Sequence, residues 1–130
     1  MIAIDTNVLV RLFVADDPAQ SPRAAKIFAS EDVLVPKTVV LETEWVLRFS
    51  YALPRKTIAG AFRTLLGAAS VTVEDSAAVR GAVDRYVAGM DFADALHLAS
   101  SGTAAKFLTF DKKLARAAAR SKTSPTVQIA

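Results

Sequence analysis

Hydrophobic positions along the chain fall into two kinds of pattern. Short apolar runs alternate with longer stretches in which apolar residues recur at helical spacing. The short runs predict five strands, at Ile2–Ile4, Val33–Val35, Val71–Val73, Phe107–Phe110 and Val127–Ile129. The longer stretches predict helices at Ser21–Ser30, Thr38–Ser50, Thr57–Ala69, Ala77–Val87, Ala93–Ala105 and Leu114–Arg120, with a further helix that begins near Val8.

This alternation of strands and helices predicts an α/β fold. Parallel neighbours in a sheet need crossover connections, and the helices between the strands supply them. We therefore expect a three-layer α/β/α arrangement around a mostly parallel sheet. With 130 residues and 52% hydrophobic content, the chain suits one compact domain that spans residues 1–130.

The composition excludes several classes of site. The chain has no cysteine, so disulfides, thiolate zinc sites and cysteine nucleophiles are all excluded. The segment Met1–Asp5 carries no basic leader, and no charge-free stretch approaches the roughly 20 residues that span a bilayer. We therefore expect a soluble, cytoplasmic protein with no signal peptide and no membrane anchor.

The net charge of +3 is distributed unevenly along the chain. Five basic residues and no acidic residue follow Asp111, namely Lys112, Lys113, Arg116, Arg120 and Lys122. A basic segment at this place would suit a polyanionic substrate whose phosphates need neutralising. The alternative interpretation is a solvated helix face.

Four acidic residues adjoin apolar runs, namely Asp5, Glu42, Asp94 and Asp111. Carboxylates at the edge of a core are costly unless a cation gathers them, and the usual cation is a divalent metal. Asp5 and Asp111 directly follow predicted strands, and ligands of open parallel sheets bind beyond the carboxyl ends of the strands. An all-oxygen set of this kind suits Mg²⁺ or Mn²⁺.

Helix capping offers an alternative explanation for three of these acids. Asp5 and Asp111 each precede a predicted helix, and Asp91 and Asp94 have the spacing of a capping box. Glu42 resists this interpretation because apolar residues flank it on both sides. Glu44 lies roughly 200° further around the helix, so one of the two glutamates should point to solvent.

The four acids belong to four segments of distinctive composition. These are Asp5-Thr6-Asn7, Leu41-Glu42 followed by Trp45-Val46-Leu47, Asp91-Phe92-Ala93-Asp94-Ala95-Leu96-His97, and Leu108-Thr109-Phe110-Asp111. In order and spacing they resemble the successive motifs of PIN-domain ribonucleases, specifically the VapC-type toxins of bacterial toxin–antitoxin pairs. The resemblance covers nearly the whole chain. One such motif is weakly specific, whereas four in order are strongly specific.

The resemblance implies a metal-dependent endoribonuclease with a mostly parallel sheet of about five strands. Asp5, Glu42, Asp94 and Asp111 match the acidic quartet that holds Mg²⁺ or Mn²⁺. Asp5 and Asp94 are the expected primary ligands, while Glu42 and Asp111 would coordinate through water or orient the nucleophile.

Other positions match supporting features of the family. Thr6 matches a small hydroxyl residue that supports the site, and Asn7 completes the first motif by fixing the turn. Asp91 is a less uniform feature, which supports the site or caps a helix. Glu44 stands where the family more usually has an apolar residue.

The resemblance also implies partners. These are an RNA substrate, a second copy of the chain in a homodimer, and a small antitoxin protein that forms a complex with the toxin. Trp45, Phe49, Tyr51 and Phe62 supply aromatic area, most of which we expect in the core and the rest in an exposed groove that receives a helix of the antitoxin.

Alternatives to a toxin ribonuclease remain at this point. One is a PIN-like domain that binds RNA or a protein without cutting. Another is a phosphoryl-handling α/β protein such as an aspartyl-phosphate phosphatase or a receiver domain, although Thr6-Asn7 after Asp5 departs from the Asp-x-Asp or paired aspartates that those folds favour. His97 is expected to be a hydrogen-bonded histidine near the core, and with no second histidine a zinc site is improbable.

Overall fold

The computed structural model describes residues 1–121, 123 and 125–130. Lys122, which belongs to the predicted basic segment, lies outside the described residues. The chain divides into two compact units, Met1–Ser76 and Ala77–Ala130. Each unit is described by itself below.

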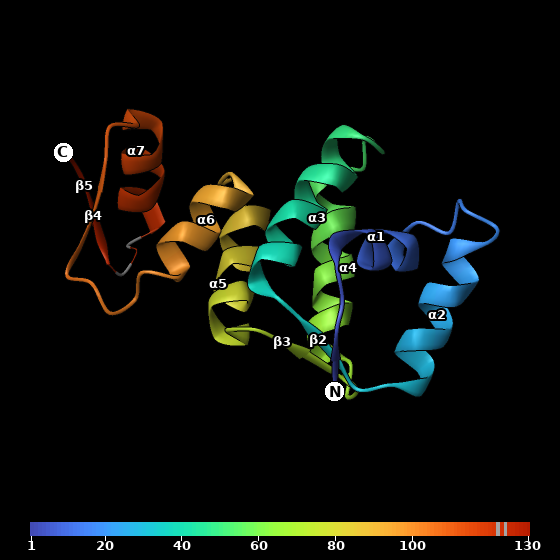
Figure 1. Cartoon of the computed structure of the whole chain (residues 1–130). Coiled ribbons are helices and arrows are strands. Elements are labelled where there is room, and N and C mark those ends of the chain that lie inside the picture. Colours follow the sequence, from blue (N-terminus) through green and yellow to red (C-terminus); the bar gives the residue numbers. More distant parts are fainter. Residues whose placement is uncertain (122, 124) are drawn as a thin grey trace. The chain divides into compact units, whose positions relative to one another are not determined.

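The first unit is built on a three-stranded parallel sheet (Figure 1). Its strands are β1 (Ile2–Ala3), β2 (Val33–Val35) and β3 (Val71–Val73), in the order β1-β2-β3. Ile2 pairs with Val33, and Val33 in turn pairs with Val71. The helices of this unit are α1 (Thr6–Phe13), α2 (Gln20–Ser30), α3 (Lys37–Phe49) and α4 (Arg55–Gly67).

Helix faces with regular apolar spacing form the core of the first unit. In α3, Val40 and Leu47 lie seven positions apart and are completely buried. In α4, Ile58 and Phe62 lie four positions apart and are also completely buried. Helix α4 packs against β3, and α1 packs against both α2 and α3. The sheet is therefore covered by helices whose polar faces remain exposed.

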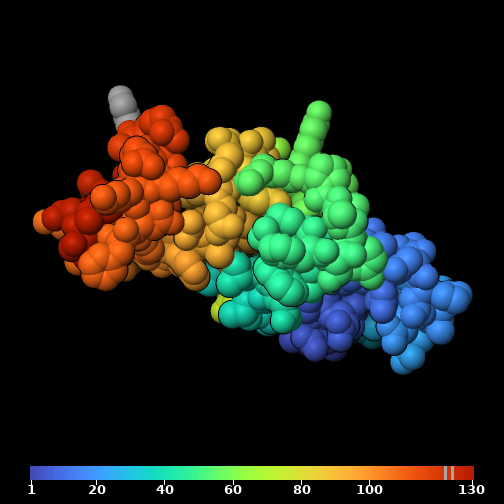
Figure 2. Space-filling model, turned by 90° about the horizontal axis from the view of Figure 1, so that it is seen from above, coloured from blue at the N-terminus to red at the C-terminus, as the bar shows by residue number. Residues whose placement is uncertain are grey.

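The described residues of the second unit form three helices and a pair of parallel strands. Helix α5 (Ser76–Val87) begins at the boundary and is followed by α6 (Phe92–Ala99), β4 (Lys106–Thr109), α7 (Lys112–Ser121) and β5 (Thr126–Ile129). Strand β4 pairs with β5, and α7 packs on both strands. The surface of the second unit is coloured from yellow through orange to red in the space-filling view (Figure 2).

Aromatic and small side chains hold the second unit together. Tyr86 and Phe92 meet edge to face, with their ring centroids 5.2 Å apart. Leu114 and Ala118, four positions apart on α7, are buried. Phe110 is 84% exposed, because it lies beyond the last residue of β4.

The predicted α/β class, the five strands and all seven helices are confirmed within the described residues. Every described strand pair is parallel, but the strands form a three-stranded and a two-stranded sheet. The helix expected at Ala93–Ala105 was predicted too long, since α6 ends at Ala99. Its chain then turns, with the Ser101 hydroxyl donating to the His97 carbonyl and the Ala104 N–H to the Ser101 carbonyl. None of the described helices combines the length and the apolar character that a bilayer crossing needs.

Candidate functional site

Asp5 occupies the junction between β1 and α1. Its carboxylate caps α1 by accepting a hydrogen bond from the Thr6 N–H, with 2.7 Å between Oδ1 and N. The capping interpretation of Asp5 is therefore correct, but it uses only one carboxylate oxygen. Within the described part of the chain, Asp5 Oδ2 has no hydrogen-bond partner, so a bound cation could take it.

Thr6 joins α1 to α3. Its buried hydroxyl donates a hydrogen bond to Glu42 Oε1. Asp5 and Glu42 thus lie on either side of Thr6, one bonded to its N–H and the other to its hydroxyl. This is a support for the Glu42 carboxylate of the kind that the family resemblance implied for Thr6.

Glu44, and not Glu42, is the buried glutamate of α3, although the apolar residues on both sides of Glu42 suggested the reverse. Glu42 is exposed, whereas Glu44 is only 2% exposed. Glu44 shares its helix face with Val40 and Leu47, four positions before and three after it, which places it toward the core. Arg48 compensates its charge, with 2.7 Å between Nε and Oε2. Because Glu42 is exposed, its apolar sequence neighbours are not an argument that a metal ion must bind its carboxylate.

The second unit holds a cluster of three carboxylates. Asp91 caps α6 by accepting the Asp94 N–H, with 3.2 Å between Oδ2 and N. Asp111 caps α7 by accepting the N–H groups of Lys113 and Leu114, with Oδ1–N distances of 2.9 and 3.2 Å. The capping interpretation is correct for Asp91 and Asp111.

Asp94 is the half-buried acid of this cluster. Burial raises the pKa of its carboxyl, and the negative charges of Asp91 and Asp111 raise this pKa further, while His97 lowers it. The ionised form of Asp94 is therefore disfavoured unless a cation lies nearby. This is the electrostatic environment that a divalent ion would relieve.

The expectation that His97 lies near the core is wrong, because its side chain is exposed. The buried face of α6 is formed by Phe92, Ala95, Leu96 and Leu98. His97 falls on the opposite face with Asp94, three positions before it. His97 interacts with the acids electrostatically, by lowering the pKa of the Asp94 carboxyl.

The carboxylate oxygens of the four acids fit a hard divalent ion, although a complete set of ligands is not seen among the described residues. Among the described residues, no group of three or more His, Asp or Glu side chains is placed to hold a metal ion. Asp5 and Glu42 belong to the first unit, and Asp94 and Asp111 belong to the second. All four offer oxygen ligands, which Mg²⁺ and Mn²⁺ prefer.

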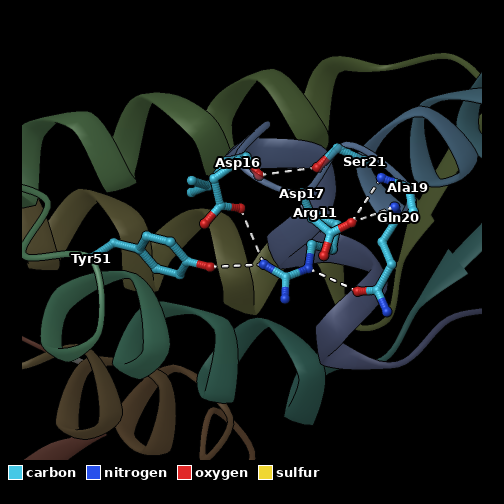
Figure 3. A network of polar contacts seen from close by, with 8 residues as sticks. Arg11, Asp16, Asp17, Ala19, Gln20, Ser21 and Tyr51 are labelled. Atoms are coloured by element: carbon cyan, nitrogen blue, oxygen red, sulfur yellow. Dashed lines mark hydrogen bonds and ion pairs between the residues drawn. The ribbon is translucent and has the colours of Figure 1, made fainter.

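Later on the same helix that begins at Thr6, the structure shows a polar network around Arg11 that the sequence did not suggest (Figure 3). The Arg11 guanidinium donates to Gln20 Oε1 at 2.9 Å, to Asp16 Oδ1 at 3.1 Å and to the Tyr51 hydroxyl at 3.0 Å. Asp17 accepts the N–H groups of Gln20 and Ala19, and these bonds lower the pKa of its carboxyl. The network fixes α1, the following loop and the loop after α3 relative to one another.

Asn7 contributes to this region in a way that differs from the expectation. Its side chain makes no hydrogen bond within the described residues, so it does not fix the turn by that means. It lines a pocket of about 200 Å³ together with Arg11, Gln20 and Arg23. No sequence signal pointed to this pocket, because its lining comes from two helices that meet only in the folded chain.

The four aromatic residues expected to form a partner surface differ in exposure. Trp45 and Phe49 are 54% and 61% exposed, and their ring centroids lie 5.1 Å apart. Phe62 is completely buried and Tyr51 belongs to the Arg11 network. Of these four residues, the two exposed ones both lie on α3, on the face that also carries Glu42.

The family model described as PIN domain matches residues 2–120, a range that includes all four acids. A comparison with curated protein sequences gives no significant match. Among solved structures, the chain is similar to VapC20 of Mycobacterium tuberculosis, described as a sarcin-ricin loop cleaving toxin. The identity is 21% and the TM-score 0.46, over 96% of this chain and 98% of that chain.

Proposed function

Because the chain belongs to the PIN-domain family, whose α/β/α fold class it shares, we propose that it is a Mg²⁺- or Mn²⁺-dependent endoribonuclease that acts as the toxin of a toxin–antitoxin pair. The observation that carries this proposal is the family match over residues 2–120, which spans the whole acidic quartet. The arrangement within each unit supports it. Asp5 and Asp111 each lie two residues beyond the end of a parallel strand and directly precede a helix.

Under this proposal Asp5, Glu42, Asp94 and Asp111 are the residues that bind the divalent metal. When bound, the ion supplies an acidified water for attack on a phosphodiester and stabilises the leaving 3′ oxygen. Asp5 and Asp94 are the proposed direct ligands. Glu42 and Asp111 act through water or orient the attacking water.

In the first unit, the residues around the acids keep them oriented. The hydrogen bond from Thr6 to Glu42 leaves the second oxygen of Glu42 free to orient a water. The Thr6 N–H holds one oxygen of Asp5 and leaves the other for a cation. Both acids are thereby oriented before any ligand binds, which lowers the entropic cost of binding.

In the second unit, mutual repulsion prepares the acids for a cation. The pKa of Asp94 is raised, and a bound cation would favour its ionised form. Asp91 adds negative charge beside Asp94 while its own carboxylate stays bound to the start of α6. We propose that Asp91 supports the site in this way rather than by ligating the ion.

The proposed protein partner is an antitoxin that covers the exposed aromatic face of α3. Trp45 and Phe49 form an exposed apolar pair, and the Arg48 guanidinium lies 4.5 Å from the centre of the Phe49 ring. A helix of an antitoxin laid on this surface would also cover Glu42. We propose that the toxin forms a homodimer as well, which mass measurement of the purified chain would test.

The proposed activity is tested by cleavage of labelled RNA with Mg²⁺, with Mn²⁺ and with EDTA. Asp5→Asn removes a ligand charge, and we expect it to lower the cleavage rate by at least about a hundredfold. The matched control is Asp32→Asn, because Asp32 is exposed and its side chain has no partner in the described residues. The proposal fails if cleavage survives Asp5→Asn undiminished, or if the wild-type chain binds RNA without cutting it.

A further inference from the structure

An open cleft of about 370 Å³ lies in the second unit, between the end of α5 and one face of α7. Arg85 borders it on the α5 side, and Lys113 and Arg120 border it on the α7 side. None of its described lining residues is acidic. The cleft is therefore a concentration of positive charge in a unit whose functional acids lie elsewhere.

The three cationic side chains of the cleft are available to a ligand. Within the part of the chain that the structure describes, Arg85, Lys113 and Arg120 form no ion pair and no side-chain hydrogen bond. Arg11, Lys37 and Arg48 in the first unit, by contrast, are each paired with a carboxylate. Unpaired cations that gather in one cleft attract an anion.

The spacing on α7 suits an extended anion with more than one charge. Lys113, Ala117 and Arg120 follow each other at intervals of four and three residues, so they lie on one face of the helix. Lys113 and Arg120 are separated by about 10 Å along the helix axis. The small side chain of Ala117 between them leaves room for a backbone to approach.

The C-terminal end of α5 repels an anion less strongly than a helix end whose carbonyl groups lack hydrogen bonds would. The carbonyl of Arg85 accepts the Met90 N–H, and the carbonyl of Tyr86 accepts the Gly89 N–H, each at 3.0 Å. This turn depends on Gly89, whose φ of +113° suits glycine alone. Carbonyls that would otherwise repel an anion at this border are thus already bonded.

We propose that the cleft between α5 and α7 binds the sugar–phosphate backbone of the RNA substrate, with Arg85, Lys113 and Arg120 facing phosphate oxygens. The inference rests on the proposed ribonuclease function and adds a substrate-binding surface to it. Asp111, one of the proposed site acids, accepts the Lys113 N–H, so the cleft begins two residues from the site. Contacts to phosphates position a strand without reading its sequence.

The test measures binding of a short, fluorescein-labelled, single-stranded RNA of mixed sequence to the full chain carrying Asp94→Asn, which we expect to be unable to cleave. Lys113→Gln and Arg120→Gln are made in this background, singly and together. The matched controls are Lys112→Gln and Arg116→Gln, which remove the same charge from exposed positions of α7 that do not line the cleft. A melting curve of each variant verifies that it is folded.

We expect each cleft variant to weaken binding several-fold at low salt. Loss of one phosphate contact should lower the slope of log Kd against log salt by about 0.7, and the double variant should lower it by about 1.4. The control variants should leave the slope unchanged. In an RNA of the same sequence whose phosphates are all replaced by neutral methylphosphonates, Lys113→Gln should have no effect on binding, because Lys113 then faces no charged phosphate.

Equal effects of the cleft and control variants would overturn the inference. Binding of an acidic peptide, rather than RNA, in a manner that depends on Lys113 and Arg120 would also overturn it, by assigning the cleft to a protein partner. The proposed function is judged separately from cleavage by the wild-type chain. If the wild type cleaves RNA while the cleft variants behave like the controls, the binding surface alone is wrong; if the chain neither binds nor cleaves RNA, both are wrong.

Discussion

The two units of the molecule treat their charged side chains differently. In the first unit, Arg11 is paired with Asp16, Lys37 with Asp75 and Arg48 with Glu44. In the second unit, the acids around Asp94 repel one another, and the cations of the α5–α7 cleft have no partner among the described residues. These three ion pairs of the first unit are compensated, whereas the charges around Asp94 and in the α5–α7 cleft of the second unit are not, among the described residues.

This difference separates charges that stabilise the fold from charges that await a ligand. A paired charge on a rigid element fixes neighbouring elements, as the Arg11 network does. A cluster of like charges lowers stability, so its presence indicates that a ligand of opposite charge relieves it. The comparison therefore predicts opposite consequences for removing a charge from each unit.

The largest expected effect on stability comes from Glu44, the paired acid of the first unit. Glu44→Gln should lower the free energy of unfolding by about 1–3 kcal/mol, because it breaks a charge-assisted bond to a buried carboxylate. Glu42→Gln, at an exposed position of the same helix, should change it by less than about 0.5 kcal/mol. Urea unfolding measures both values.

The same pair of variants should show the reverse order in RNA cleavage. Glu42→Gln removes a proposed site carboxylate and should abolish cleavage, whereas the folded Glu44→Gln variant should keep it. If Glu44→Gln destroys cleavage in a folded protein while Glu42→Gln does not, Glu44 is the functional glutamate and the assignment is wrong.

Thr6 connects the stable first unit to the proposed activity. Thr6→Val removes the hydroxyl that holds Glu42 and should lower the rate of RNA cleavage about tenfold. Thr6→Ser keeps the hydroxyl and serves as the control. Similar rates for the two variants would show that the hydrogen bond to Glu42 does not orient the site.

Removing the charge of Asp94 from the second unit should increase stability. Asp94→Asn should raise the free energy of unfolding of the metal-free protein by on the order of 0.5 kcal/mol at neutral pH, because it removes one member of a like-charged set. The folded-state pKa of Asp94 is raised, so its ionised form costs stability above that pKa, and this cost disappears as the pH falls below the ordinary value of 3.8. The advantage of Asp94→Asn should therefore vanish in acid. Unfolding curves at neutral and acidic pH test this sign, and a destabilised variant at neutral pH would contradict it.

The smallest effect is expected for Asp17 in the first unit. The backbone N–H groups of Gln20 and Ala19 lower the pKa of its carboxyl, so its ionised form stabilises the fold above the ordinary value of 3.8. This contribution is lost as the pH falls through the lowered pKa. Asp17→Asn should melt slightly below the wild type at neutral pH and together with it in strong acid. Equal melting temperatures at neutral pH would show that these hydrogen bonds contribute nothing.

Much of the fold could be predicted because it depends on local periodicity. The strand at Val71–Val73 and the apolar faces of α3 and α4 follow directly from the spacing of their residues. The same periodicity also indicates which of the two glutamates is buried, since Glu44 and not Glu42 shares a face with Val40 and Leu47. The error came from weighing sequence neighbours instead of helical neighbours.

The rest depends on contacts between elements that are distant in sequence. Tyr51 meets Arg11 across 40 positions, and Arg85 joins Lys113 and Arg120 at a cleft only after two helices have folded. The raised pKa of Asp94 likewise depends on the position of Asp111. Capping motifs were visible in sequence, but charge compensation across the fold was not.

The central claim is that Asp5, Glu42, Asp94 and Asp111 are the residues that bind divalent metal. Titration of the full chain with Mn²⁺, followed by electron paramagnetic resonance of the free ion, tests this claim directly. The account predicts that the wild type and Asp32→Asn bind Mn²⁺ with equal affinity, whereas Asp5→Asn in the first unit and Asp94→Asn in the second each weaken binding by at least about tenfold. Unchanged Mn²⁺ affinity in either Asp5→Asn or Asp94→Asn would contradict it.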